Sequence, residues 1–234
     1  MTLIDLVPTT IAPAIAVDLY RDIHKGIRAE LFALTAQAGA LDPTPGVGRA
    51  ALAAHVSDVV DLLVQHAEHE DGPIQPALEA ELPDLAERIA SDHLVLEAQL
   101  VDLREMAADA AALDHAEPRL AVHRLYLALA CFTGRYLEHI DVEERIVMPA
   151  LERAVGVDAV AAIHGAIISS IPPDEMARSL ALMIPAMNVD DRVELLGGMQ
   201  AGAPAEVFAG VWSLVGSVLE PAEATPLARR LGLG

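Results

Sequence analysis

The sequence of 234 residues has little cysteine, few aromatic residues and few basic residues. Cys131 is its one cysteine, so these residues can form neither an internal disulfide nor a cysteine-ligated zinc or iron–sulfur site within one chain. Lysine and arginine number 15 against 35 aspartates and glutamates, which gives a formal net charge of −20. Because this charge repels phosphate groups, we expect neither nucleic acid nor an anionic membrane as a partner.

Long apolar runs are also missing, although the hydrophobic fraction is 53% and the mean hydropathy is +0.38. The longest charge-free run after residue 150, Ala159–Pro173, has 15 residues, and a spanning helix needs about 18 or more. No lysine or arginine precedes Arg21, so the beginning of the sequence lacks the positive region of a secretory signal. We therefore expect a cytoplasmic protein.

The composition favours helices, because alanine and leucine are abundant and sustained alternation of β-branched residues is absent. Glycine and proline divide the chain into segments of helical periodicity. We predict four long helices, at about 14–38, 48–71, 83–113 and 118–154. Four short helices are predicted after them, at about 157–169, 173–184, 189–196 and 204–219. Pro149 should kink the end of the fourth long helix, because it removes a backbone donor.

One sequence pattern occurs twice, 73 residues apart. Each copy has a histidine and a glutamate four residues apart, an acid directly after the glutamate, and Pro-Ala-Leu at the same distance downstream. The two copies begin at His66 and His139, with Glu70 and Glu143 as their glutamates. Positions i and i+4 lie on one face of a helix, so the imidazole and the carboxylate can reach one metal centre. This donor set suits iron, manganese or zinc.

An isolated histidine precedes each copy at a similar distance. His24 lies 42 residues before His66, and His93 lies 46 residues before His139. The chain therefore reads as two helical hairpins, each with one histidine and one His-x3-Glu pair. Two such hairpins packed together form a four-helix bundle with metal ligands on facing helices.

At these residues the chain resembles the haemerythrin-like, or HHE, family over about residues 14–154. The resemblance implies an all-α, up-and-down four-helix bundle with a non-haem di-iron centre, in which manganese or zinc could substitute. It implies six metal ligands, namely His24, His66, Glu70, His93, His139 and Glu143. We accordingly expect a haemerythrin-like domain at residues 1–156 and a helical extension, packed on or beside the bundle, at residues 157–234.

The pattern departs from that of the oxygen-carrying haemerythrins, whose third helix gives His-x3-His and whose fourth gives His-x4-Asp. Here Glu97 stands where a fifth histidine would stand, and the fourth helix carries Glu143. The chain looks more like the bacterial di-iron proteins of iron–sulfur-cluster repair and the iron-sensing domain of a eukaryotic ubiquitin-ligase subunit. The cysteine-bearing domain of the repair proteins is absent from these residues, which puts a repair role in doubt.

The number of ligands bears on the chemistry. If both glutamates and an oxo or hydroxo group bridge the two ions, each iron has five ligands and keeps one open position. We therefore expect a centre that binds or reacts with O2, peroxide or NO, as a scavenger or an oxidase-type enzyme. The alternative is a non-enzymatic iron or O2 sensor, or a storage module, that is read by a partner protein.

Two tyrosines lie one helical turn before candidate ligands, Tyr20 before His24 and Tyr136 before His139. Both side chains should point toward the metals. They could donate a hydrogen bond to a bound oxygen species, or they could be ordinary half-buried residues of the bundle.

Other residues are alternatives or additions to this set. Glu97 is a candidate seventh ligand or an acceptor for a ligand histidine, and His69 is an alternative to His66. Residues 157–234 should fold over the mouth of the site with His164 nearest the opening, or they form a homodimer or bind a protein partner. Cys131 is expected in the core.

Overall fold

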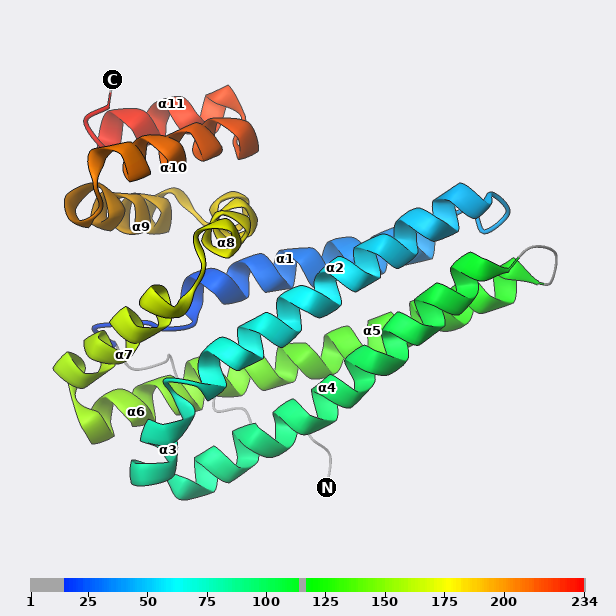
Figure 1. Cartoon of the computed structure of the whole chain (residues 1–234), viewed down its shortest axis with the longest axis horizontal. Coiled ribbons are helices and arrows are strands. Elements are labelled where there is room, and N and C mark those ends of the chain that lie inside the picture. Colours follow the sequence, from blue (N-terminus) through cyan, green and yellow to red (C-terminus); the bar gives the residue numbers. More distant parts are fainter. Residues whose placement is uncertain (1–14, 114–116, 234) are drawn as a thin grey trace.

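The computed structural model describes residues 15–113 and 117–233, and in these ranges the chain is helical and contains no strand. Four long helices run side by side as an up-and-down bundle (Figure 1). They are α1 (Arg21–Ala40), α2 (Gly46–Asp71), α4 (Pro83–Ala112) and α5 (Pro118–Val142). The predicted all-α bundle with short helices after it is confirmed.

The bundle core consists of apolar residues at alternating spacings of three and four. On α1 the buried residues Ile27, Leu31, Leu34 and Ala38 form one stripe. The other three long helices contribute similar stripes, and together these residues form one continuous cluster. A stripe with this period faces one direction on a helix, so each long helix buries one side in the bundle.

The first long helix begins later than predicted. Residues 15–20 are not helical, α1 begins at Arg21, and Ala14 lies outside the described residues. The reason is a local turn, because Asp18 Oδ1 accepts hydrogen bonds from the backbone N–H groups of Tyr20 and Arg21, at 3.1 and 3.0 Å. Such bonds compete with helix formation and favour a turn.

A π-helical turn lies just before Pro149, the residue at which a kink is predicted. Helix α5 continues into this turn, η2 (Glu143–Val147), and then into α6 (Met148–Val155). The backbone N–H of Met148 bonds to the carbonyl of Glu143, five residues earlier. Proline cannot donate the next bond, so the widened turn just before it resolves the conflict.

The two Pro-Ala-Leu tails occupy equivalent places in the fold. Pro76 lies in the first turn of a short helix that was not predicted, α3 (Gln75–Glu81), and Pro149 lies in the first turn of α6. Leu78 and Leu151 are both buried in a second apolar cluster, where α3 and α6 contact each other. The repeated tails therefore close the same end of the bundle.

Five short helices follow α6. They are α7 (Val157–Ser170), α8 (Pro173–Ala186), α9 (Val189–Gly202), α10 (Ala205–Val218) and α11 (Pro221–Arg230). Helix α9 runs six residues past its predicted end, and α11 was not predicted. Gly197 and Gly198 lower the helical propensity of α9. The helix continues through them because Leu196 is buried in the apolar cluster that α9 shares with the neighbouring short helices.

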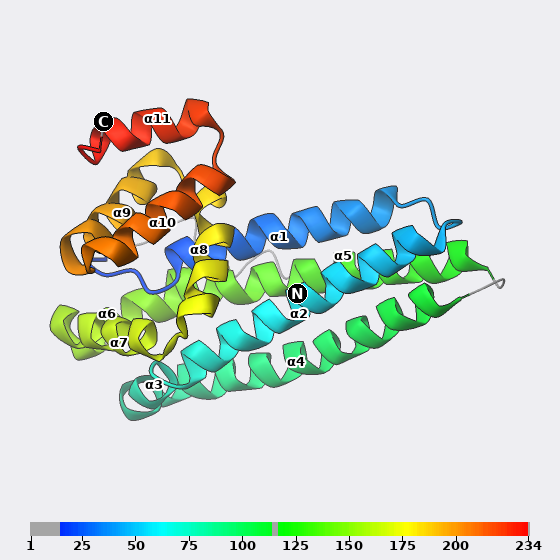
Figure 2. The ribbon, with the colours of Figure 1, turned by 45° about the horizontal axis from the view of Figure 1, so that its top comes forward.

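Helices α8–α11 share a third apolar cluster of their own, and α8 lies against α1 (Figure 2). Gly26 on α1 permits a close approach of α8, because a Cβ atom there would lie 2.8 Å from Leu182 Cγ. Helix α7 lies against α6 and α2 at the end of the bundle closed by α3. Among the described helices, none has the length and apolar character needed to cross a membrane.

Candidate metal centre

The six residues that the resemblance marks as ligands come together at the end of the bundle closed by α3 and α6. They form two overlapping groups, within each of which the ligand atoms lie within 4.8 Å of one another. One group is His24, His66 and Glu70, and the other is Glu70, His93, His139 and Glu143. All six side chains are buried. The groups are those expected of a binuclear metal site.

The four histidines form two pairs. His24 on α1 and His66 on α2 bring their Nε2 atoms within 3.2 Å of each other. His93 on α4 and His139 on α5 form the second pair, with ring centroids 4.9 Å apart. Each pair therefore belongs to one helical hairpin, and each could supply two nitrogen ligands to one metal ion.

Each glutamate faces both histidine pairs. Glu70 Oε1 lies 3.0 Å from His66 Nε2, while its Oε2 lies 3.6 Å from His93 Nε2. Glu143 is arranged in the same way, with Oε1 3.1 Å from His139 Nε2 and Oε2 3.5 Å from His24 Nε2. One oxygen of each carboxylate thus lies beside each pair, so each carboxylate could bridge two ions bound there.

The buried polar atoms of this cluster fit a metal centre. Both carboxylate oxygens of Glu70 and Glu143, and Nε2 of His93, lack a hydrogen-bond partner among the described residues. A buried polar atom without a partner costs roughly 1–3 kcal/mol, and more when it is charged. Two cations between the histidine pairs would satisfy these atoms and neutralise both glutamates.

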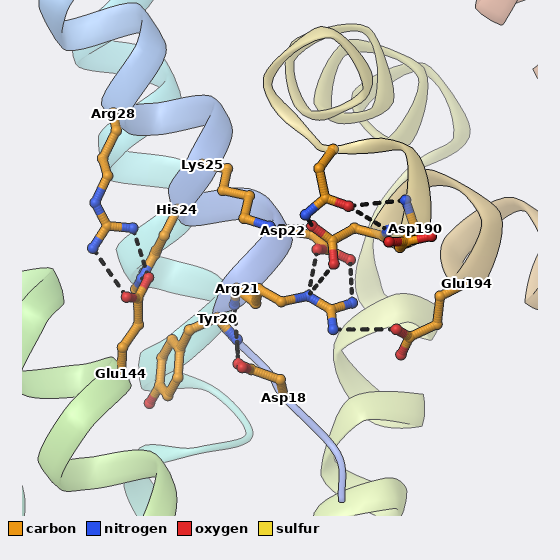
Figure 3. Close-up of polar contacts among 12 residues, drawn as sticks. Asp18, Tyr20, Arg21, Asp22, His24, Lys25, Arg28, Glu144, Asp190 and Glu194 are labelled. Carbon is orange, nitrogen blue, oxygen red and sulfur yellow. Dashed lines mark hydrogen bonds and ion pairs between the residues drawn. The ribbon is translucent and has the colours of Figure 1, made fainter. Parts of the chain in front are cut away.

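The acid that follows each glutamate holds the isolated histidine of the other hairpin. Asp71 Oδ1 lies 2.9 Å from His93 Nδ1, and Glu144 Oε1 lies 3.0 Å from His24 Nδ1. Figure 3 shows Glu144 between His24 and Arg28, whose guanidinium donates two hydrogen bonds to it. An Nδ1–H that donates to a carboxylate leaves Nε2 available to a metal.

These acceptors are functional residues that the sequence analysis missed. The signal was present, since an acid follows the glutamate in both copies of the pattern. Glu97 was considered as such an acceptor or as a seventh ligand, but it lies on the exposed side of α4, outside both groups. Asp71 and Glu144 take the acceptor role instead.

The structure also shows where the remaining candidate residues lie. His69 lies outside both groups and faces α8, where its Nε2 is 3.2 Å from Glu175 Oε1. His164 is exposed on α7 and lines a cavity that also reaches His66. Cys131 was expected in the core but is exposed, because Phe132 and Thr133 take the inward positions on this turn of α5.

Both tyrosines next to the candidate ligands are buried, with exposed fractions of 2% for Tyr20 and 3% for Tyr136. Their rings lie 5.2 Å from His24 and 5.8 Å from His139, respectively, between centroids. Burial, and then the negative charges of the two glutamates, raise the pKa of both phenols well above the usual value. Both hydroxyls therefore remain protonated.

Nearby carboxylates raise the pKa of two histidines in the cluster, so these histidines hold protons when no metal is bound. Burial lowers the pKa of His24, but Glu144 and Glu70 outweigh this effect and raise it to about 9. Burial likewise opposes the rise at His93, where Glu143 and Glu70 bring the pKa to about 11. Burial raises the pKa of Glu144, but His24 and Arg28 lower it to about 2.

An up-and-down helical bundle with two buried histidine pairs and two shared glutamates defines a class of helical metal-binding domains. The model of the hemerythrin HHE cation binding domain matches residues 15–151, more than half of the chain, and the chain therefore belongs to this family. No curated protein and no solved structure matched the chain.

We predict that the wild-type protein binds about two metal ions per chain. Glu70→Ala and Glu143→Ala should each abolish binding of both ions, because each carboxylate faces both histidine pairs. His24→Ala should mainly weaken one ion. Metal analysis after anaerobic loading with Fe(II) measures these contents.

The matched control is His55→Ala. His55 lies away from the cluster and contacts Gln37 and Glu30, so its loss should leave the metal content unchanged. Two ions retained by Glu70→Ala would contradict the bridging role.

We further predict that the metal-free protein loses stability as the pH rises. Folding raises the pKa of His24 and His93 above 6.5, the value in the unfolded chain. Below pH 6.5 their protonation therefore contributes its full stabilisation to the folded state. This contribution disappears as the pH passes about 9 for His24 and about 11 for His93. For His24 alone the loss is about 3 kcal/mol.

Urea unfolding of chelator-treated protein at pH 6, 7.5 and 9 measures this loss. The metal-loaded protein should show the opposite slope, because metals displace these protons and bind more tightly at higher pH. A free energy of unfolding that does not change with pH in the metal-free protein would contradict the prediction.

Proposed function

We propose that this chain holds two non-haem iron ions, for which manganese or zinc could substitute, and uses them to bind or react with O2, peroxide or NO. The observation that carries the proposal is the pair of carboxylates that each face both histidine pairs. Two nitrogens and two carboxylate oxygens per ion leave positions open in an octahedral site. Iron bound there would supply electrons and open positions for a small oxidant.

The donor set supports iron or manganese over structural zinc. Structural zinc sites are four-coordinate and usually contain thiolates, and Cys131 lies exposed outside both groups. The six candidate ligands are imidazoles and carboxylates without a thiolate, a donor set that suits iron or manganese.

The protein itself contributes orientation, protons and exclusion of water. Asp71 and Glu144 fix the rings of His93 and His24 through their Nδ1 atoms. Tyr20, together with Glu70, His93 and Glu143, lines a void of about 10 Å³. A void of this size is close to the space that one water molecule needs. A protonated phenol beside it is suited to donate a hydrogen bond to a small oxygen or nitrogen ligand.

We expect iron-loaded protein, supplied with ascorbate as the electron donor, to reduce repeated additions of peroxide to water, with absorbance changes that recur at each addition. Tyr20→Phe should slow this cycle by about 10- to 100-fold, the effect of one lost hydrogen bond to a charged ligand, while the iron content stays at the wild-type value. Tyr126→Phe is the matched control, because Tyr126 packs against Gly39 at the opposite end of α1. Wild-type protein that reacts once and then stops would contradict turnover.

The alternative function, a sensor read through the carboxy-terminal helices, is favoured by one set of contacts. Arg21 and Lys25 flank His24 on α1 and both contact Asp191 of α9, with Arg21 Nε 3.7 Å from it. Arg21 also reaches Glu194, 3.2 Å away (Figure 3). A movement of α1 when His24 binds a metal would therefore be transmitted to α9.

The single tryptophan, Trp212, provides a reporter for this alternative, because it packs in the cluster formed by α8–α11. If the chain is a sensor, Zn²⁺ should shift its emission maximum, since Zn²⁺ does not quench fluorescence as iron does. The shift should disappear in Asp191→Ala and persist in Asp174→Ala, which removes an exposed pair with Arg178. An unchanged emission in wild-type protein would count against the sensor.

A further inference from the structure

A cavity of about 140 Å³ lies between the bundle and the carboxy-terminal helices. Helices α1 and α2 form one wall, and α7 and α8 form the other. Its lining is mainly aliphatic and sulfur-containing, and includes Leu62, Ile74, Ile167, Ile171, Met176 and Met183. The helices after the bundle thus enclose a space that the four long helices alone would leave open to solvent.

This cavity reaches one side of the metal centre. His66 and Glu70 line it and also belong to the group that includes His24. Both oxygens of Glu70 are buried without a hydrogen-bond partner. His93 and His139 are not among the lining residues. The cavity therefore meets the ion position of the first histidine pair and not that of the second.

Three of the acids that line the cavity already have partners. Asp18 accepts bonds from the α1 backbone, and Asp22 pairs with Arg21 at 2.8 Å. Glu175 of α8 pairs with His69 of α2 at 3.2 Å, across the two walls. With Glu70 these carboxylates give the surroundings a negative charge that disfavours anions. Apart from Glu70, whose oxygens lie beside the histidine pairs, these acids offer no unpartnered carboxylate to a cationic ligand.

We propose that this cavity binds one small, neutral, largely apolar organic molecule beside the ion position of His24 and His66. This inference rests on the proposed function, because it names the class of molecule that would bind next to the metal centre. The volume sets the size, since a cavity of about 150 Å³ is large enough to hold benzene. Methionines in the wall, Met176 and Met183, adapt to the shape of such a ligand.

Benzene is the test probe, and benzoate is its charged counterpart. Calorimetric and NMR titrations of the full-length metal-free protein should show one saturable benzene site and at least tenfold weaker binding of benzoate. Ser179→Phe places a ring in the cavity and should weaken benzene binding at least tenfold. Ser213→Phe is the matched control, because Ser213 is exposed on α10 and does not line the cavity.

A second variant tests the same cavity in case Ser179→Phe does not fold. Met176→Ala enlarges the cavity and should admit naphthalene, which the wild-type protein should exclude. Proton relaxation tests whether benzene binds next to the metal centre. Because Mn²⁺ is paramagnetic and Zn²⁺ is not, the protons of bound benzene should relax faster in Mn²⁺-loaded than in Zn²⁺-loaded protein.

The possible failures can be told apart. Metal content is measured in every variant and should equal that of the wild type in Ser179→Phe. Benzene binding without metal binding would overturn the proposed function, while metal binding without a saturable benzene site would overturn only the cavity proposal. Equal benzene affinity in Ser179→Phe and wild-type protein, or equal affinity for benzoate, would also overturn it.

Discussion

The structure depends on one constraint, the burial of two glutamates and four histidines at the centre of a helical bundle. Two carboxylates of like charge within a few ångströms of each other are costly in an apolar core unless cations lie between them. The cluster allows either protons on His24 and His93 or metal ions in this role. Helices α3 and α6 close this end of the bundle, α7 packs against α6 and α2, and α8 packs against α1.

The supporting acids connect the two halves of the molecule. Asp71 from the first hairpin holds His93 of the second, and Glu144 from the second holds His24 of the first. Each histidine pair is therefore oriented only when both hairpins are packed together. Binding of metals and packing of the hairpins become one cooperative event, because a ring released by its acceptor no longer aims its Nε2 at the shared glutamates.

Much of the fold and of the candidate site could be predicted, because the signals are local. Proline and glycine mark the ends of the long helices, and the i, i+4 spacing places each histidine and glutamate on one face. Contacts between distant segments could not be predicted. The exposure of Glu97 and Cys131 depends on the rotation of their helices in the bundle, and the partners of Asp71 and Glu144 lie 22 and 120 residues away. The start of α1 depends on a turn at Asp18 that competes with a helical pattern.

Each isolated histidine is hydrogen-bonded to an acid of the other hairpin, and this exchange bears on how such a chain could arise. Each hairpin contains one histidine, one His-x3-Glu pair, one following acid and one Pro-Ala-Leu tail, and the tails meet between α3 and α6. Two identical hairpins related by a twofold axis would therefore build the same centre, each completing the other. Duplication and fusion of a gene for one self-associating hairpin would yield the bundle. The two halves differ in the π-helical turn that only the second copy carries among the described residues.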